Sequence, residues 1–405
     1  MNNYGDVINW MYSQLPFYQR QGSKAYKPNL GRMSDFVNYL GNPQNKIKII
    51  HVGGTNGKGS TSHMIASVLQ DANYKVGLYT SPHIKSFRER IKINGNKIGK
   101  KNIVEFIKSN FQYINKNKLS FFEISVGIAF YFFNLSKVDI AIIEVGMGGR
   151  LDATNVIEKP LMSVITNISL EHTKFLGKTR KKIAIEKAGI VKKNSILVVG
   201  QFDDEISGVF KSIADDKKTK LLILDKSVKQ IFKSDLIGNY QTQNIGLSYL
   251  ALKNITGFKI SKENLKKGFE NVRKNTGLRL RWEEQSQKPK VIFDISHNKA
   301  GFELAVNQFD DYKFKKLRMV LGFVKDKNIE EIVNCLPNDA EYYLCKPNVE
   351  RGFNLKKLKN IFDKFKLSNS TFKDVKLAYD CAKKNSDNDD LIYVGGSTFI
   401  FEKLI

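Results

Sequence analysis

The stretch GGTNGKGST, residues 53–61, decides the fold. It lies between the apolar run IKIIHV, residues 47–52, which predicts a buried strand, and a helical pattern from about Ser60 to Asn73. Its glycines let backbone N–H groups turn inward around a phosphate chain, and the start of the helix adds the positive end of its dipole. Lys58 can reach the outer phosphates, and Ser60 or Thr61 offers a hydroxyl to a metal ion or a phosphate. The stretch therefore predicts a phosphate-binding loop.

The chain on either side repeats this alternation of strand and helix. Five more strands are predicted at KVGLYT (75–80), VDIAIIEVG (138–146), LMSVITNI (161–168), SILVVG (195–200) and LLILD (221–225). Helical patterns separate most of them, and residues 239–255 and 261–273 are typical of two further helices. Such alternation is characteristic of a mostly parallel sheet with helices on both faces, so the predicted fold class is α/β.

A second α/β series follows a polar stretch, EEQSQKPK at residues 283–290, which we interpret as a linker. Its predicted strands are VIFDIS (291–296), LRMVLGF (317–323), EYYLC (341–345) and LIYVGG (391–396). A chain of 405 residues is too long for one ordinary core. We therefore expect a larger domain over residues 1–284 and a smaller, Rossmann-like domain over residues 285–405.

The chain is strongly basic, with a formal net charge of +26. Binding to nucleic acid is one explanation of this charge, and a lysine-coated surface is the other. We favour the second, because tracts such as KKNIVEFIKSN (100–110) interleave lysine with apolar residues at helical spacing. No tract combines a basic block with the aromatic repeats of a single-strand binder. We expect no nucleic-acid partner.

The sequence also favours a cytoplasmic protein. No apolar run approaches the roughly 18–20 residues that cross a membrane, and the first residues lack the pattern of a secretory signal. Cys335, Cys345 and Cys381 lie far apart, fit no metal-ligand spacing and suit a reducing compartment. We expect no membrane association, and we expect a monomer.

The phosphate loop departs from the standard pattern G-x-x-x-x-G-K-[ST], because Val52 occupies the first glycine position and Gly59 follows Lys58. This spelling resembles the Mur ligase superfamily, and GTNGKGS resembles its folylpolyglutamate synthase and dihydrofolate synthase branch. Further segments similar to that branch follow in order along nearly the whole chain: TSPHIKSFRERIKING (80–95), SFFEISVGIAFYFF (120–133), EVGMGGRLDATN (144–155), ITNISLEHTKFLG (165–177), IAIEKAGIVK (183–192) and DISHNKAG (294–301). The resemblance implies a P-loop Mur-ligase-type domain and a C-terminal ligase domain that closes over ATP and binds glutamate.

The activity implied by the resemblance is an ATP-dependent ligation. L-Glutamate is added to the carboxylate of dihydropteroate or a reduced folate through an acyl phosphate, which supplies the leaving group that a free carboxylate lacks. Two other functions are considered. Another Mur-type amino-acid ligase would keep the phosphate loop and the Mg²⁺ site but change the pterin segment, and the SFFE and EKAGI segments argue against it. A nucleic-acid-stimulated NTPase would explain the charge, but no helicase-like motif set accompanies the loop.

The metal site is predicted partly from the residues themselves. Glu144 ends a buried strand opposite the phosphate loop, where a carboxylate commonly holds Mg²⁺ against nucleotide phosphates. The resemblance adds Ser81, His172 and Lys187, and it implies two Mg²⁺ ions and a carbamylated Lys187. Carbamylation requires a neutral amine, so the site must lower the pKa of this lysine. The chain departs from the family at Glu171, where Asp is usual before the histidine.

The remaining site residues are also implied by the resemblance. ATP contacts are expected from Asn56, Gly57, Lys58, Gly59, Ser60, Asn244, Arg281 and Asp294. Arg279-Leu280-Arg281 replaces the family's Pro-Gly-Arg, and the register from Asp294 favours Arg281 over Arg279. Lys58, Lys187 and His297 are the expected catalytic residues, and His297 or Asp294 would orient phosphate or glutamate. The pterin contacts are expected from Asn29, Phe122, Glu123, Leu151, Asp152 and Ala153. The run Asn29-Leu30-Gly31-Arg32 keeps the family's arginine but lacks its acid.

Overall fold

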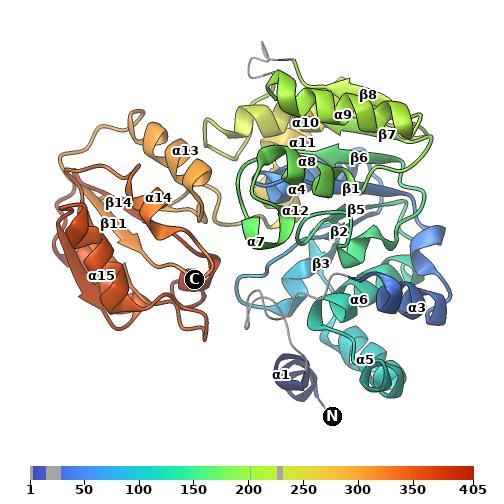
Figure 1. Cartoon of the computed structure of the whole chain (residues 1–405), viewed down its shortest axis with the longest axis horizontal. Coiled ribbons are helices and arrows are strands. Elements are labelled where there is room, and N and C mark those ends of the chain that lie inside the picture. Colours follow the sequence, from blue (N-terminus) through green and yellow to red (C-terminus); the bar gives the residue numbers. More distant parts are fainter. Residues whose placement is uncertain (1–2, 15–28, 201, 226–230) are drawn as a thin grey trace. The chain divides into compact units, whose positions relative to one another are not determined.

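The computed structural model describes residues 3–14, 29–200, 202–225 and 231–405, which divide into two compact units. The first unit extends to Leu278, except that Leu236–Tyr240 belongs with Arg279–Ile405 in the second. Each unit is built on its own sheet (Figure 1).

The sheet of the first unit has eight strands in the order β4-β3-β2-β5-β1-β6-β7-β8. The parallel strands are β1 (Ile49–Gly53), β2 (Val76–Tyr79), β5 (Ile140–Glu144), β6 (Met162–Ile165), β7 (Ile196–Val199) and β8 (Lys220–Ile223). The short strands β3 (Ile91–Ile93) and β4 (Asn96–Lys97) extend the sheet in antiparallel fashion. Every residue of β1, β5 and β6 is buried, as expected of strands covered on both faces.

Helix α4 (Lys58–Asp71), which follows the phosphate loop, packs on β1, β2 and β5. Helices α10 (Gln241–Asn254), α11 (Lys262–Glu270) and α12 (Val272–Thr276) pack against α4 in turn. The other α-helices described in this unit are α1 (Tyr4–Gln14), α3 (Gly31–Tyr39), α5 (Lys100–Lys116), α6 (Phe121–Leu135), α7 (Thr173–Leu176), α8 (Arg180–Ala188) and α9 (Asp204–Asp216). Short 3₁₀ turns lie at η2 (Pro43–Lys46), η3 (Phe87–Arg90) and η4 (Ala153–Val156).

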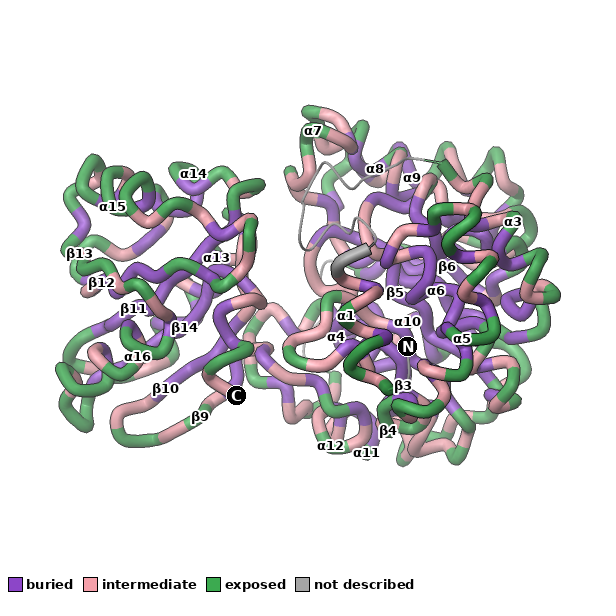
Figure 2. Tube along the Cα trace, turned by 90° about the horizontal axis from the view of Figure 1, so that it is seen from below, coloured by how far each residue is buried: buried purple, intermediate pink, exposed green. Residues whose placement is uncertain are grey.

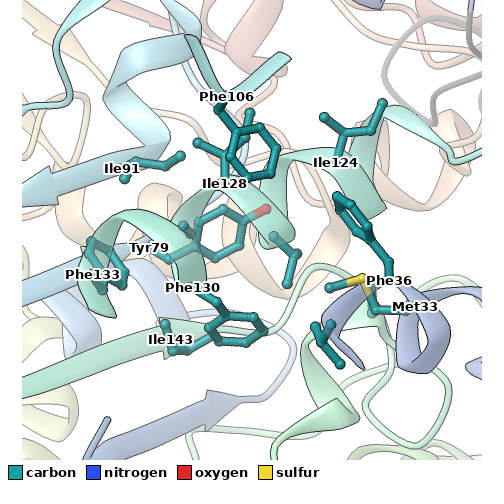
Figure 3. Packing of buried hydrophobic residues seen from close by; sticks show 14 of the residues in the cluster. Met33, Phe36, Tyr79, Ile91, Phe106, Ile124, Ile128, Phe130, Phe133 and Ile143 are labelled. Carbon is teal, nitrogen blue, oxygen red and sulfur yellow. The ribbon is translucent and has the colours of Figure 1, made fainter. Parts of the chain in front are cut away.

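The largest core of the first unit is aromatic. Phe36 of α3, Phe106 of α5 and Phe130 of α6 pack with Tyr79 and Ile143 from the sheet (Figure 3). Because aromatic side chains bury large apolar areas, this cluster fixes α3, α5 and α6 against the sheet. It thereby positions the start of α6, which carries Phe122 and Glu123.

The sheet of the second unit has six strands in the order β13-β12-β11-β14-β10-β9. The parallel strands are β10 (Lys290–Phe293), β11 (Leu317–Leu321), β12 (Glu341–Cys345), β13 (Asn369–Phe372) and β14 (Leu391–Gly395). The helices of this unit are α13 (Lys299–Phe309), α14 (Ile329–Val333), α15 (Leu355–Lys364), α16 (Val375–Lys384) and the 3₁₀ helix η5 (Thr398–Lys403). Strands β11 and β14 run buried through its centre (Figure 2).

The predicted α/β fold class is confirmed, and the apolar runs quoted above coincide with strands. The interpretation of residues 283–290 as a linker is wrong. Strand β9 (Glu283–Gln287) pairs with β10 in antiparallel fashion across this stretch. It escaped prediction because an edge strand with one solvated face carries polar residues, and EEQSQ contains no apolar residue.

Candidate active site

The strand register places four loops at one edge of the first sheet. Val52 of β1 pairs with Glu144 of β5, and Gly53 pairs with Ile165 of β6. Tyr79 of β2 pairs with Ile143 on the other side of β5. The chain segments that follow these neighbouring parallel strands therefore emerge together, at the carboxyl edge where α/β proteins bind ligands.

The phosphate loop is shaped by glycine and held by the loop after β6. Gly54 has φ +137°, and a Cβ atom there would lie 1.9 Å from Oγ1 of Thr166. The Thr166 hydroxyl donates to the carbonyl oxygen of Asn56 at 2.6 Å. The Asn56 N–H donates to Oδ1 of Asn167 at 2.7 Å. The loop therefore has a fixed shape, set by its own glycine and by two polar side chains of the neighbouring strand's loop.

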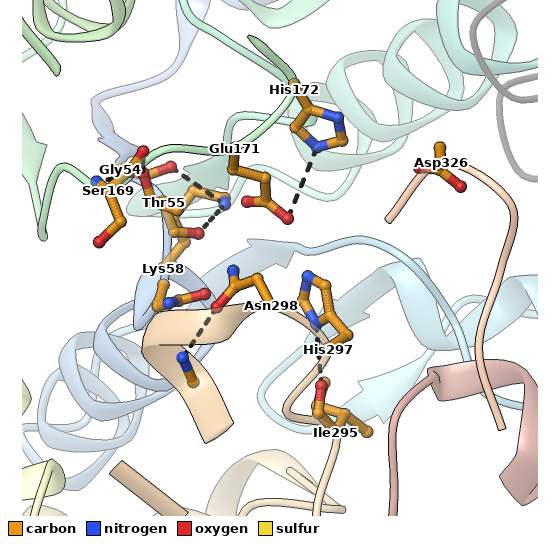
Figure 4. A network of polar contacts seen from close by, with 12 residues as sticks. Gly54, Thr55, Lys58, Ser169, Glu171, His172, Ile295, His297, Asn298 and Asp326 are labelled. Carbon is orange, nitrogen blue, oxygen red and sulfur yellow. Dashed lines mark hydrogen bonds and ion pairs between the residues drawn. The ribbon is translucent and has the colours of Figure 1, made fainter. Parts of the chain in front are cut away.

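Lys58 lies at the first position of α4, and its ammonium group curls back over the loop. Nζ donates to the carbonyl oxygens of Gly54 at 3.2 Å and Thr55 at 2.9 Å (Figure 4). The predicted ATP residue Asn244 of α10 lies against the same loop, since a Cβ atom on Gly57 would lie 2.4 Å from its Oδ1. Gly59 and Ser60 are buried in the first turn of α4, and Gln241 donates to Ser60 Oγ at 3.4 Å.

Lys187 of α8 is buried, with 3% of its surface exposed. Its Nζ donates to the carbonyl oxygen of Gly54 at 2.6 Å. Burial, reinforced by the positive charge of Lys58, lowers the pKa of Lys187 to about 7, while the carboxylates of Glu171 and Asp152 oppose the shift. A large fraction of this amine is therefore neutral near pH 7, as carbamylation requires.

The carboxylate of Glu144 is 4% exposed at the end of β5 and accepts the Ser81 N–H at 2.9 Å. His172 has φ +51°, and its Nε2 lies 3.9 Å from Oε1 of Glu171 (Figure 4). Within residues 3–14, 29–200, 202–225 and 231–405, no group of three His, Cys, Asp or Glu side chains could hold a metal ion. The predicted ligand set instead combines carboxylate, hydroxyl, imidazole and a modified amine.

Comparisons with known proteins show the family of the chain. Residues 52–262 match the model of the Mur ligase middle domain, and residues 278–398 match that of the Mur ligase glutamate ligase domain. The chain is 33% identical to the dihydrofolate synthase/folylpolyglutamate synthase of Bacillus subtilis, over 83% of each protein. The chain belongs to the folylpolyglutamate synthase and dihydrofolate synthase family of Mur ligases.

Solved structures of other family members resemble this Mur ligase over nearly its whole length. Escherichia coli FolC, in complex with DHPP and ADP, has a TM-score of 0.87 at 26% identity, and the match covers 100% of this chain and 97% of that one. A bifunctional folylpolyglutamate synthase/dihydrofolate synthase with Mn, AMPPNP and L-glutamate bound has a TM-score of 0.84 at 26% identity, covering 100% and 97% of the two chains. A Haloferax volcanii relative named a probable bifunctional folylpolyglutamate synthase/dihydropteroate synthase is 28% identical over 98% of this chain, which spans only 49% of that protein.

Both carboxylates predicted to bind the pterin have partners within this Mur ligase. Glu123 accepts the Ser120 N–H at 2.6 Å in a capping box at the start of α6, and its Oε1 lies 3.2 Å from Nη2 of Arg32. Asp152 accepts the N–H groups of Met147 at 2.9 Å and Thr154 at 3.0 Å, and burial raises its pKa. These contacts define loop structure, whatever else the two side chains bind.

The other predicted pterin residues lie near these carboxylates or on the surface. Phe122 lies over the backbone of Gly146, since a Cβ atom there would be 2.4 Å from the Phe122 ring. Leu151 and Ala153 flank Asp152 in the loop after β5, and Ala153 is 9% exposed. Asn29 is exposed, and its Oδ1 accepts the Gly31 N–H at 2.6 Å.

In the second unit, Asp294 directly follows β10 and is 2% exposed. It accepts the Trp282 N–H at 2.9 Å, the Tyr240 hydroxyl at 3.0 Å and the Ser296 N–H at 2.8 Å. His297 Nδ1 lies 2.8 Å from the Ile295 carbonyl oxygen, so this nitrogen carries the hydrogen (Figure 4). The loop that follows β10 is thus held in place by hydrogen bonds to the Asp294 carboxylate.

Arg279 and Arg281 differ in their contacts. Arg279 Nε lies 2.6 Å from Oε1 of Glu283 in an ion pair. Arg281 Nη1 donates to the carbonyl oxygens of Arg279 at 3.4 Å and Leu280 at 3.2 Å. Its neighbours Leu280 and Trp282 have positive φ angles of +61° and +49°, which are unusual for bulky residues and occur mainly where the fold enforces them.

Sequence reasoning missed the residues that support the site. Thr166 and Asn167 fix the phosphate loop, and their signal is a TN pair directly after an apolar strand. His51 of β1 lies under the loop after β5, with Nε2 2.8 Å from Oγ1 of Thr154. Burial lowers the pKa of His51 to about 3, so the ring is neutral. A histidine in the middle of an apolar run gives no hint of this contact.

Proposed function

We propose that this protein is an ATP-dependent ligase that joins L-glutamate to the carboxylate of dihydropteroate or a reduced folate through an acyl phosphate. The observation that carries the proposal is the convergence, on Gly54 of the phosphate loop, of Lys58 and the buried Lys187. Membership of the folylpolyglutamate synthase and dihydrofolate synthase family supports the choice of substrates, as does the glutamate ligase domain match over residues 278–398.

The donors at the sheet edge fit a divalent cation held against nucleotide phosphates. Ser81, Glu144, His172 and a carbamylated Lys187 would hold two Mg²⁺ ions, and the support for this is that the buried Glu144 is joined to Ser81 by a hydrogen bond at the edge that carries the phosphate loop. Mg²⁺ supplies charge neutralisation on the transferred phosphoryl group. The carbamate would form when the neutral Lys187 amine attacks CO₂ and releases one proton, giving an anionic oxygen donor.

The protein's own groups would act at each charged stage. The substrate carboxylate attacks the γ-phosphate of ATP and displaces ADP to give the acyl phosphate, and Lys58 and the N-terminus of α4 stabilise the charge that develops. The amine of glutamate then attacks the carbonyl carbon of the acyl phosphate, the amine loses a proton, and phosphate leaves as the amide forms. We propose that His297 and Asp294 orient phosphate or glutamate, and that the glutamate is bound by residues 285–405. The expectations of a cytoplasmic monomer without nucleic acid stay predictions.

The test measures phosphate release from ATP and Mg²⁺ with glutamate, comparing dihydropteroate, tetrahydrofolate and no pterin. Release that needs both glutamate and a pterin is the expected result, and the preferred pterin identifies the dominant activity. Release that is indifferent to both, but increased by DNA or RNA, would refute the folate ligase and leave a nucleic-acid-stimulated NTPase.

Replacing Arg281 with Ala should lower phosphate release about 10²-fold, because a guanidinium that stabilises transferred phosphate is lost. Replacing Arg279 with Ala should change thermal stability instead, since it breaks the ion pair with Glu283. Steady-state kinetics and thermal melts of both variants check this. If the Arg279 variant lost the activity and the Arg281 variant kept it, the choice of ATP residue would be reversed.

A further inference from the structure

The loop that carries Ser81, residues 80–86, is held by side chains of the 3₁₀ helix η3 (Phe87–Arg90). The Glu89 carboxylate accepts the N–H groups of Ile84 at 2.8 Å, Ser86 at 2.9 Å and Lys85 at 3.4 Å. Three consecutive backbone donors converge on one carboxylate, so this half of the loop has a single defined shape.

Arg90 holds the other half of the same loop. Its carbonyl oxygen accepts the Thr80 N–H at 3.0 Å, and its Nε donates to Nδ1 of His83 at 2.8 Å. Because arginine only donates, His83 Nδ1 carries no hydrogen, and Nε2 therefore donates to the hydroxyl of Tyr12 on α1 at 3.0 Å. Ser81 lies between Thr80 and His83, and its own N–H is bound by Glu144.

Arg90 is unusual in its surroundings. It is 2% exposed, and among the described residues it forms no ion pair with a carboxylate. Its guanidinium lies 5.2 Å from the centre of the Phe121 ring, and its positive charge opposes the rise in the pKa of Tyr79 that burial causes. Burying a cation without a counter-charge is unfavourable. A neutral side chain in a purely structural role would therefore cost less free energy of folding.

We propose that Glu89, Arg90, His83 and Tyr12 form a clamp that positions Ser81 for the divalent cation. The inference rests on the proposed function, in which Ser81 is a metal ligand. The clamp residues touch neither substrate nor metal: they act through the backbone of residues 80–86. Residues that orient metal ligands in this way typically change metal affinity 10- to 100-fold when altered.

The test measures Mn²⁺ binding without turnover. Electron paramagnetic resonance of free Mn²⁺ is followed at a fixed AMPPNP concentration, with AMPPNP alone as the reference. Arg90→Lys keeps the charge but removes the Nε donor, and it should raise the Mn²⁺ dissociation constant about tenfold. Tyr12→Phe removes a single hydroxyl from a contact at the far end of the clamp and should raise the constant about fivefold.

The matched control is Arg318→Lys in the second unit. Arg318 is also buried, at 4% exposure, and pairs with Asp390 and Glu341. This variant should lower the melting temperature and leave the Mn²⁺ dissociation constant unchanged. The Ser81→Ala variant supplies the second control, because Arg90→Lys should cause no further loss once Ser81 is absent.

The outcomes separate the clamp from the proposed function. Wild-type protein that retains Mn²⁺ with AMPPNP, together with an Arg90→Lys variant of unchanged affinity, would overturn the clamp alone. Additive losses in the Ser81→Ala, Arg90→Lys double variant would also overturn it, because Arg90 would then act independently of Ser81. Wild-type protein that retains no Mn²⁺ with AMPPNP would overturn both the metal site and the clamp.

Discussion

Replacing Lys187 with Met should lower phosphate release about 10²- to 10³-fold while raising the melting temperature. The activity falls because the proposed carbamate, an anionic ligand beside the phosphate loop, cannot form. The stability rises because Met fills a similar volume without a buried amine, whose protonation is disfavoured by burial and by Lys58. Steady-state kinetics and thermal melts measure the two effects on the same samples.

The pH dependence of stability provides a second measure of the same group. In buffer freed of CO₂, where Lys187 is an unmodified amine, its pKa is about 7 in the folded protein and about 10.5 in the unfolded chain, so the unfolded state binds more protons between these values. The contribution of Lys187 to stability therefore rises as the pH increases from about 7 to about 10.5, and its penalty is complete below pH 7. The Met variant should lack this rise.

The control for both measurements is Lys181→Met, an exposed position on the same helix, which should change neither activity nor the pH profile. Removal of bicarbonate and CO₂ should lower the activity of the wild-type protein, and readdition should restore it. An active Lys187→Met variant would rule out the carbamate as a catalytic group.

Replacing Gly54 with Ala should lower phosphate release about 10²-fold and the free energy of unfolding by at least about 2 kcal/mol. The φ angle of +137° is accessible almost only to glycine, and the new Cβ atom would lie 1.9 Å from Oγ1 and 3.0 Å from the backbone nitrogen of Thr166. The backbone nitrogen cannot move aside as a flexible side chain could. The loop would shift, and the Gly54 carbonyl would leave Lys58 and Lys187.

Gly208→Ala in α9 is the matched control, because no atom lies within 4 Å of the Cβ position there. Alanine in this helix should raise the free energy of unfolding by about 0.5–1 kcal/mol without changing activity. Chemical denaturation and phosphate release measure both variants. Equal behaviour of the two alanine variants would contradict the steric argument at Gly54.

The sequence predicted the strands that lie in the middle of each sheet, because a strand that is buried on both faces consists mostly of apolar residues. It did not predict β13, whose residues Asn369–Phe372 are only partly buried, or β9, which is polar. Residue propensities give only a weak signal for a strand at such edges, where one face or one side of the strand is exposed to solvent. The central strands of both sheets were therefore predictable, and among the edge strands only β8 was, because its run LLILD is apolar.

The site was predictable where a sequence motif by itself determines the backbone shape, as it does in the phosphate loop. Lys187 was not predictable from physical pattern alone, because RKKIAIEKA is typical of a solvated helix in which lysines face water. Nor does a sequence distinguish Glu123, which caps α6 and pairs with Arg32, from a carboxylate open to a ligand. These properties depend on contacts between residues distant in the chain.

The hydrogen bonds that join Asn56 to Thr166 and Asn167 have a thermodynamic consequence for ligand binding. Ordering a flexible loop costs about 1–2 kcal/mol of conformational entropy per residue, and a ligand that imposes the order bears that cost. In this protein the loop is already ordered in the folded first unit, so the entropy cost of ordering it is part of folding and not of ligand binding. Nucleotide affinity should therefore be determined mainly by the contacts made to the phosphates, with little loss of affinity from ordering the loop. Calorimetry should find only a small heat-capacity change on binding.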